Sequence, residues 1–206
     1  MSKITEINYQ LPEVFAETFI RELSSSANKP LLIRGRDILT SEKDDFILKP
    51  KGGLRMYAEA GMLELLANFI ASELNLNVPE PALIHISKQF IESLYGNDNY
   101  ERISNSEGIN FGTKYLKDCL IWQDNSNLIK YRLKDLQEIF IFDMLIDNTD
   151  RTKIKPNIII NDENIYILDH EIAFAFAFLI NPDEHNPWEI TDYEKEQQTI
   201  ISSIQH

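Results

Sequence analysis

The chain has 206 residues, of which 43% are hydrophobic, and this share favours a folded globular protein over a disordered one. Its net charge of −13 argues against a nucleic-acid-binding surface, which would need a basic stripe, although local Lys and Arg residues would still allow a nucleotide to bind. The single cysteine, Cys119, excludes an intrachain disulfide, and the N-terminal residues contain no apolar signal-peptide segment. We therefore expect one globular unit in the cytoplasm, without a membrane span.

The first quarter of the chain predicts one helix and two short strands. Apolar residues recur at helical spacing from Pro12 to Leu23, so we expect a helix there. Leu31–Arg34 and Phe46–Lys49 are short apolar runs that predict strands, and Lys49 ends the second one. A lysine in such a position is in most proteins simply exposed to solvent.

Periodicity predicts a longer helix over Ala58–Leu74. Glu64 lies on a face of this helix that also carries Ala60, Ala67 and Ala71, and such small side chains allow another element to approach closely. A solvated surface glutamate is the alternative for Glu64. The apolar face directed to the core is predicted to hold Met62, Leu65, Leu66, Phe69 and Ile70.

The middle and end of the chain predict a strand, a loop and two helices. Ala82–Ile86 is the strand, and the polar residues 87–105 are expected to form a loop. Leu133–Asn148 has apolar residues on two lines, which predicts a helix buried on two sides. Residues 194–206 are expected to form one further helix.

Two β-branched runs near residue 160 predict a β-hairpin. The runs are Ile158–Ile160 and Ile165–Leu168, and the turn-forming residues Asn161–Asn164 separate them. If the hairpin is centred on this turn, Asn157 lies opposite Leu168. Asn157 and Asp169 then emerge side by side at the open end of the hairpin.

Asp150 precedes the hairpin closely enough to reach the same point as Asn157 and Asp169. Two carboxylates and a carboxamide are hard oxygen donors, of the kind that hold Mg²⁺ together with the phosphates of a substrate. The alternative is a polar turn with solvated acids, which are common in so acidic a chain.

The order of these features resembles the HipA-like kinases, which share a distant layout with protein kinases. The resemblance starts from the loop Asp150-Arg151, followed by Asn157, the hairpin and Asp169-His170. It continues upstream and covers most of residues 30–180. The upstream segments that carry it are the strand-end lysine Lys49, the helix acid Glu64, the tract NLNVPEPALI of residues 75–84, and the segment GINFGTKYL of residues 108–116.

The resemblance implies an α+β, two-lobed protein-kinase-like fold. A small β-rich N-lobe would cover residues 1–117, and a reduced helical C-lobe would cover residues 118–206. The two lobes would form one compact unit. Backbone groups of residues 108–116 would read the adenine base.

The resemblance also implies roles for five residues, with ATP and Mg²⁺ as cofactors. Asp150 would accept or orient the proton of the attacking hydroxyl, while Asn157 and Asp169 would bind Mg²⁺. Lys49 would hold the nucleotide phosphates, and Glu64 would orient Lys49. In the same picture Arg151 braces the catalytic loop, and His170 is a structural residue.

Two positions depart from the family pattern. Many HipA-like sequences place a metal-binding Asn five residues after the catalytic Asp, where this chain has Lys155, a cation that would repel Mg²⁺. Either the loop bulges so that Asn157 takes over as ligand, or Lys155 itself contacts phosphate. The other departure is Glu171, where relatives tend to have Gly.

Three functions therefore stay open. The first is an ATP- and Mg²⁺-dependent kinase that phosphorylates a protein Ser or Thr and is a component of a bacterial toxin–antitoxin pair, a role that rests on family analogy alone. The second is a catalytically impaired pseudokinase that senses a nucleotide or binds a partner. The third is a small-molecule phosphotransferase. Expected partners are a protein substrate and either an antitoxin or a separate protein that supplies the N-terminal domain common in the family.

Overall fold

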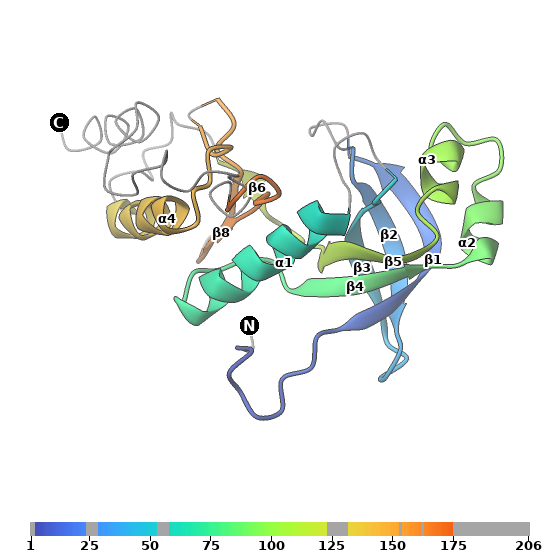
Figure 1. Cartoon of the computed structure of the whole chain (residues 1–206), viewed down its shortest axis with the longest axis horizontal. Helices are drawn as coiled ribbons and strands as arrows, with labels where there is room; N and C mark the ends of the chain where they lie inside the picture. The colour runs from blue at the N-terminus through green and yellow to red at the C-terminus, as the bar shows by residue number, and fades with distance from the viewer. Residues whose placement is uncertain are drawn as a thin grey trace, which may run out of the picture.

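The computed structural model describes residues 3–23, 29–52, 58–122, 132–152, 154–161 and 163–174. In these ranges the protein is a mixed α/β structure with a closed barrel of five strands, a separate sheet of three strands and a small number of helices (Figure 1). Figure 1 shows the barrel at one end of the molecule, helix α4 and the second sheet at the other end, and helix α1 between them.

Neighbouring strands of the barrel follow the order β1-β2-β3-β5-β4. Pairing is antiparallel except between β4 and β1, whose parallel ladder joins Leu83–His85 to Glu13–Phe15 and closes the barrel. Side chains alternate between the barrel core and its outer face, as the period of two in a strand requires. The strands are β1 (Glu13–Glu22), β2 (Leu31–Asp37), β3 (Lys43–Lys49), β4 (Pro81–Ile86) and β5 (Gly108–Lys114).

The helix predicted over Pro12–Leu23 is wrong, because this segment is strand β1. Val14 and Ala16 are buried in the barrel core, whereas Phe15 between them is 39% exposed. The apolar residues at helical spacing misled the prediction, because pairing with β2 and β4 decides the conformation of this segment.

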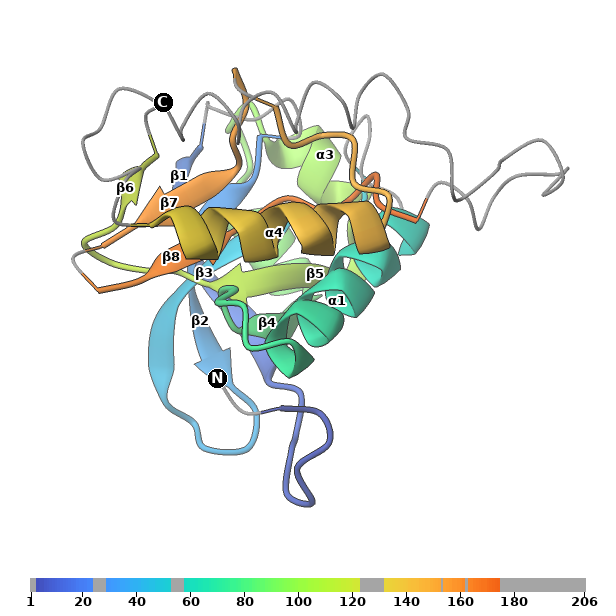
Figure 2. The ribbon, with the colours of Figure 1, turned by 90° about the vertical axis from the view of Figure 1, so that its left-hand side faces the viewer.

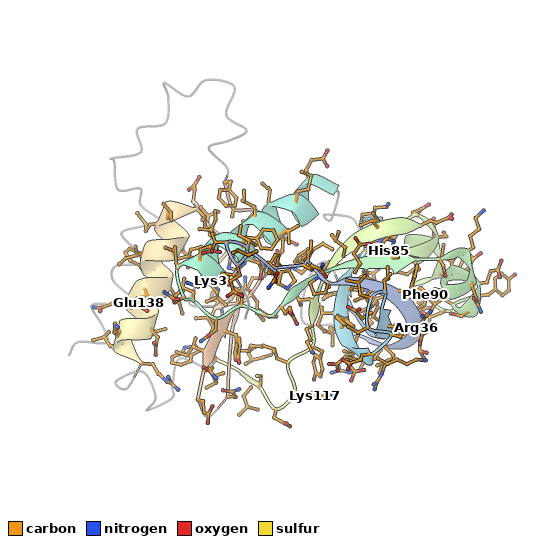
Figure 3. All side chains as sticks on the ribbon, turned by 90° about the horizontal axis from the view of Figure 1, so that it is seen from below. Lys3, Arg36, His85, Phe90, Lys117 and Glu138 are labelled. Atoms are coloured by element: carbon orange, nitrogen blue, oxygen red, sulfur yellow. The ribbon has the colours of Figure 1, made fainter. Side chains whose placement is uncertain are left out.

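The loop predicted over residues 87–105 is also wrong, because two short helices lie within it. Helix α2 (Lys88–Ser93) begins after Ser87, whose hydroxyl accepts a hydrogen bond from the Phe90 backbone N–H at 3.2 Å. Helix α3 (Tyr100–Ser104) follows, and both helices add buried side chains to the barrel core. Figure 3 shows Phe90 and Arg36 at the barrel end of the molecule and Glu138 of α4 at the other end.

Helix α1 (Ala58–Glu73) follows its predicted range closely but buries a different face from the one predicted. Met62 and Leu66 are 70% and 45% exposed, whereas the alanines beside Glu64 are buried. The alanines face the neighbouring elements because their small side chains allow close approach. The buried alanines are Ala60, Ala67 and Ala71.

The predicted β-hairpin is confirmed as strands β7 (Ile158–Ile160) and β8 (Ile165–Ile167), which pair in antiparallel register. The Leu168 N–H donates to the Asn157 carbonyl at 2.9 Å, so these two residues lie opposite each other as expected. Strand β6 (Leu120–Ile121) joins β7 on its other side.

Helix α4 (Leu133–Leu145) confirms the predicted helix, three residues shorter at its end. Ile139 and Phe142 pack against the β7–β8 hairpin in a second hydrophobic core, which also includes Ala67 and Ala71 of α1. The two predicted apolar lines are covered unequally, because Ile139, Phe142 and Ile146 are buried whereas Leu136, Phe140 and Met144 are half-buried.

The proposed division into residues 1–117 and 118–206 stays a prediction, although the barrel and the α4–hairpin unit have separate hydrophobic cores. The helix predicted over residues 194–206 lies outside the described residues. Within the described ranges, no helix has the length and apolar character needed to cross a membrane.

A substitution at Gly112 in β5 can test how tightly the barrel is packed. A Cβ atom at this position would lie 2.5 Å from the Ile47 carbonyl oxygen and would overlap the side chain of Ile84. We expect Gly112→Ala to lower the free energy of unfolding by about 1–3 kcal/mol, measured by urea denaturation. The control Glu92→Ala, on an exposed position of α2, should leave the midpoint near that of the wild type; equal midpoints for both variants would contradict this packing.

Candidate active site

Lys49 leaves the barrel at the end of β3. Leu48 points into the barrel core, so the alternation of the strand directs Lys49 to the outer face. There its ammonium group lies 3.0 Å from the Glu64 carboxylate of α1 and 3.0 Å from Asp169 Oδ1, just after β8. One ammonium group therefore connects the barrel, α1 and the hairpin, which Figures 1 and 2 show lying side by side.

Glu64 is buried within the alanine face of α1. It is 3% exposed, and its Oε2 accepts hydrogen bonds from the Lys49 ammonium and from the His170 backbone N–H, the latter at 2.9 Å. Burying a carboxylate is costly unless it is paired and hydrogen-bonded, and both conditions are met here. Glu64 thus fixes Lys49 and the segment after β8 at the same time.

The charged side chains around Lys49 shift one another's pKa values. Burial works to lower the pKa of Lys49, but the negative charges of Glu64 and Asp169 outweigh it, so the pKa of Lys49 is raised. Burial would raise the pKa of Asp169, but the ammonium groups of Lys49 and Lys155 lower it well below its usual range. Lys49 is therefore a cation, and Asp169 an anion, at neutral pH.

The loop that carries Asp150 is tied to the end of α4. Asp143, buried on the last turns of that helix, accepts a hydrogen bond from the Asn148 amide at 2.8 Å. The Asn148 side-chain oxygen accepts a longer one, 3.3 Å, from the Asp150 backbone N–H. A short chain of side-chain hydrogen bonds thus sets where Asp150 lies.

Arg151 braces the loop, as expected. Arg151 is 5% exposed, and its guanidinium donates to Asp143 Oδ2 at 2.6 Å and to the Asn157 carbonyl at 2.7 Å. It also lies 3.0 Å from His170 Nε2. Because a guanidinium only donates, Nε2 of His170 is the acceptor and the proton lies on Nδ1. Burial, together with the charges of Arg151 and Lys49, lowers the pKa of His170, so the imidazole is neutral.

Lys155 lies between the two aspartates. Its ammonium group contacts Asp150 Oδ2 and lies 3.1 Å from Asp169 Oδ2. The Asn157 amide donates to the same Asp150 oxygen at 3.2 Å. The structure thus connects Asp150 to Asp169 through Lys155, connects Asn157 directly to Asp150, and connects Asp169 to Lys49. All five residues expected from the sequence meet here, but their roles in catalysis and binding stay predictions.

Both ends of the hairpin adopt left-handed backbone conformations. Asn157 has φ 47° and Asp169 has φ 62°. Asn and Asp tolerate this region better than other residues with a side chain. The two residues therefore turn the chain sharply where it enters and leaves the hairpin, and this directs both side chains to the open end.

The oxygen donors of Asp150, Asn157 and Asp169 suit Mg²⁺ chemically, but their arrangement does not fit an ion between the aspartates. Both oxygens of Asp169 contact ammonium groups, Oδ1 from Lys49 and Oδ2 from Lys155. A divalent ion about 4 Å from the Lys155 ammonium would be repelled by about 8 kcal/mol at an effective dielectric constant of about 20. No group of three or more His, Cys, Asp or Glu side chains able to hold a metal occurs in the described residues.

Sequence reasoning missed two participants, Asp143 and Asn148, and did not foresee the contacts of Lys155. Asp143 and Asn148 hold the loop through contacts that cross a helix end, and no spacing in the sequence marks them. Lys155 drew attention as a departure from the family pattern, but its contacts with both aspartates were not foreseen. Glu171 lies near the same charges, where burial and the charge of Asp169 raise its pKa to about 7.

The segment expected to read adenine is strand β5, and its backbone is paired with β3 on one side and β4 on the other. These ladders extend to Lys114, and the Tyr115 N–H donates to the Asp45 carbonyl at 2.9 Å. The adenine contacts stay a prediction.

Comparison with known families agrees with this arrangement. Residues 19–186 match the family of HipA-like kinases. The match spans most of the chain, and the protein therefore belongs to the HipA-like kinases. No curated protein matches the chain.

Removing the Arg151 side chain should destabilise the fold. Arg151→Ala leaves the buried Asp143 carboxylate without its cation, and such a loss costs about 3–5 kcal/mol. Thermal and urea unfolding would measure it. Lys134→Ala, which removes an exposed partner of Glu138, is the control and should unfold like the wild type; similar small changes in both variants would contradict a bracing role.

Glu171 should make stability depend on pH. Its pKa is about 7 in the fold against 4.5 ordinarily, so the folded state holds its proton more tightly and stability is lost as pH rises from about 4.5 to about 7. Glu171→Gln removes this loss. Because Glu171 is partly exposed, we expect the variant to gain only about 1–2 kcal/mol relative to the wild type between pH 5 and pH 8.

Urea denaturation of both proteins at several pH values measures this difference. The comparison with the variant cancels the contributions of other groups, His170 included. A constant difference between the two proteins from pH 5 to pH 8 would contradict the raised pKa.

Proposed function

We propose that this HipA-like kinase transfers the γ-phosphoryl group of ATP to a Ser or Thr hydroxyl of a protein. The observation that supports it is the Lys49–Glu64 ion pair. Lys49 also contacts Asp169, and the side chain of Lys155 connects Asp169 to Asp150. A lysine fixed by a helix glutamate is a recurring part of phosphoryl-transfer sites. Family membership supports the kinase class, and the geometry supports these residues as its active site.

In the proposed reaction, ATP enters as its magnesium complex and Lys49 binds phosphate oxygens. Asp150 accepts the proton of the attacking hydroxyl as the hydroxyl oxygen bonds to the γ-phosphorus. The bond between the γ-phosphorus and the β–γ bridging oxygen breaks, and ADP leaves with that oxygen. Positioning of the reactants and electrostatic stabilisation account for most of the catalysis, because phosphoryl transfer needs little covalent chemistry from the protein.

A second function, a pseudokinase, is favoured by one observation. Lys155 contacts Asp150 and Asp169, so the proposed base and the proposed metal ligand are both neutralised by a lysine. A protein of this kind would keep the fold and its affinity for a nucleotide and would act by binding a partner.

We further propose a cytoplasmic protein with a protein substrate and with an antitoxin or another small protein as partner. The single Cys119 suits a reducing compartment. The toxin–antitoxin role rests on family analogy alone.

Incubation with Mg²⁺ and ATP, followed by intact mass measurement, tests the kinase. We expect a mass gain of one phosphoryl group in the wild type and none in Asp150→Asn. Asp147→Asn is the matched control, because it makes the same change in the same loop and should keep the gain. At saturating ATP the melting temperature should rise by about 5–10 °C.

A missing mass gain with the melting shift intact would overturn the kinase in favour of the pseudokinase. A missing gain without any shift would overturn both.

A further inference from the structure

The backbone of Lys155 is held in place by the loop itself. The Lys155 N–H donates to the Thr152 hydroxyl at 3.0 Å, and the Thr152 N–H donates to the Lys155 carbonyl at 3.0 Å. These two bonds tie the backbone of Lys155 to Thr152. The side chain of Lys155 therefore starts from a fixed point, unlike that of a lysine on a mobile surface loop.

The ammonium group of Lys155 joins two carboxylates that come from different elements. Asp150 lies in the loop after α4, and Asp169 lies just after β8. Asn157 adds its amide to the same Asp150 oxygen that Lys155 contacts. These three side chains are the donors expected of a metal position, and the cation among them is the ammonium group of Lys155.

The balance of charge points the same way. Glu64, Asp150 and Asp169 supply three negative charges, and Lys49 and Lys155 supply two positive ones. Without Lys155 the set would carry a charge of −2, which one divalent ion would neutralise. With Lys155 present, a divalent ion would bring these five residues to a net charge of +1 and would lie next to an ammonium group, and the partly ionised Glu171 nearby offsets only part of that charge.

We propose that Lys155 is a built-in cation that replaces a divalent metal ion between Asp150 and Asp169. The site binds a nucleotide without a metal ion held by these residues, and Lys155, with a side chain 41% exposed, remains accessible to phosphate oxygens. The nucleotide part of this inference rests on the proposed function, whereas the metal part does not.

Binding of Mn²⁺ alone, followed by electron paramagnetic resonance, tests the metal part. Replacing the lysine with a neutral oxygen ligand in Lys155→Asn should create a metal site, with Mn²⁺ affinity at least about tenfold above that of the wild type. Adding Asp169→Asn to that variant should abolish the gain. Lys155→Ala, which frees the aspartates without adding a ligand, should show a smaller gain and serves if Lys155→Asn fails to fold.

Lys43→Asn is the matched control, because Lys43 pairs with Glu17 at 2.6 Å at the start of β3 and is not part of the proposed machinery. It should bind Mn²⁺ like the wild type. Equal Mn²⁺ affinity in the wild type and Lys155→Asn would overturn the proposal, and so would a gain that survives Asp169→Asn.

The ATP-induced melting shift, measured with Mg²⁺ and with EDTA, tests the nucleotide part. We expect the apparent ATP affinity of the wild type to change less than about threefold between the two conditions, and that of Lys155→Asn to fall at least about tenfold in EDTA. A tenfold fall in the wild type would overturn this part. If ATP shifts neither protein, the proposed function fails, while the Mn²⁺ result still decides the role of Lys155.

Discussion

The ion pairs of Lys49 join parts of the chain that are far apart in sequence. Its ammonium group contacts Glu64 and Asp169, and so links the end of β3, the middle of α1 and the residue after the hairpin. Charges with such low exposure are stable only when each has its partner, so the three elements must arrive together for any of them to be satisfied. The barrel and the α4–hairpin unit have separate hydrophobic cores. The ion pairs of Lys49 connect the barrel to Asp169, the residue that follows the hairpin.

The chain of contacts continues from Asp169 to Lys155, and from Lys155 to Asp150. Negative and positive groups alternate along it, so each charge is flanked by opposite charges. Such an arrangement holds the side chains in fixed geometry before any ligand arrives. Preorganised charge is worth more to catalysis than charge that must be rearranged during the reaction.

Much of the site could be predicted from the sequence, because its residues follow elements with strong local signals. The β-branched runs define the hairpin, and the hairpin places Asn157 beside Asp169. The alanine face of α1 marked Glu64 as a residue approached closely by a neighbour. The strand β1 was missed because its pattern is also helical, and pairing with distant strands decides between the two. The contacts of Asp143 and Lys155 were missed because they depend on how a loop folds back, which spacing does not encode.

The pairing of the strands limits how another protein can bind. Each barrel strand has a neighbour on both sides, since β4 pairs with β1 and closes the ring. The outer side of β8 is covered as well, because Asn77 accepts a hydrogen bond from the Ile167 N–H at 3.0 Å and donates to the Ile165 carbonyl at 3.2 Å. Along β2, and along β8 as far as the structure describes it, an extended peptide therefore has no open strand edge to extend. A partner that binds these surfaces must recognise side chains, and the same closure protects the protein against edge-to-edge aggregation there.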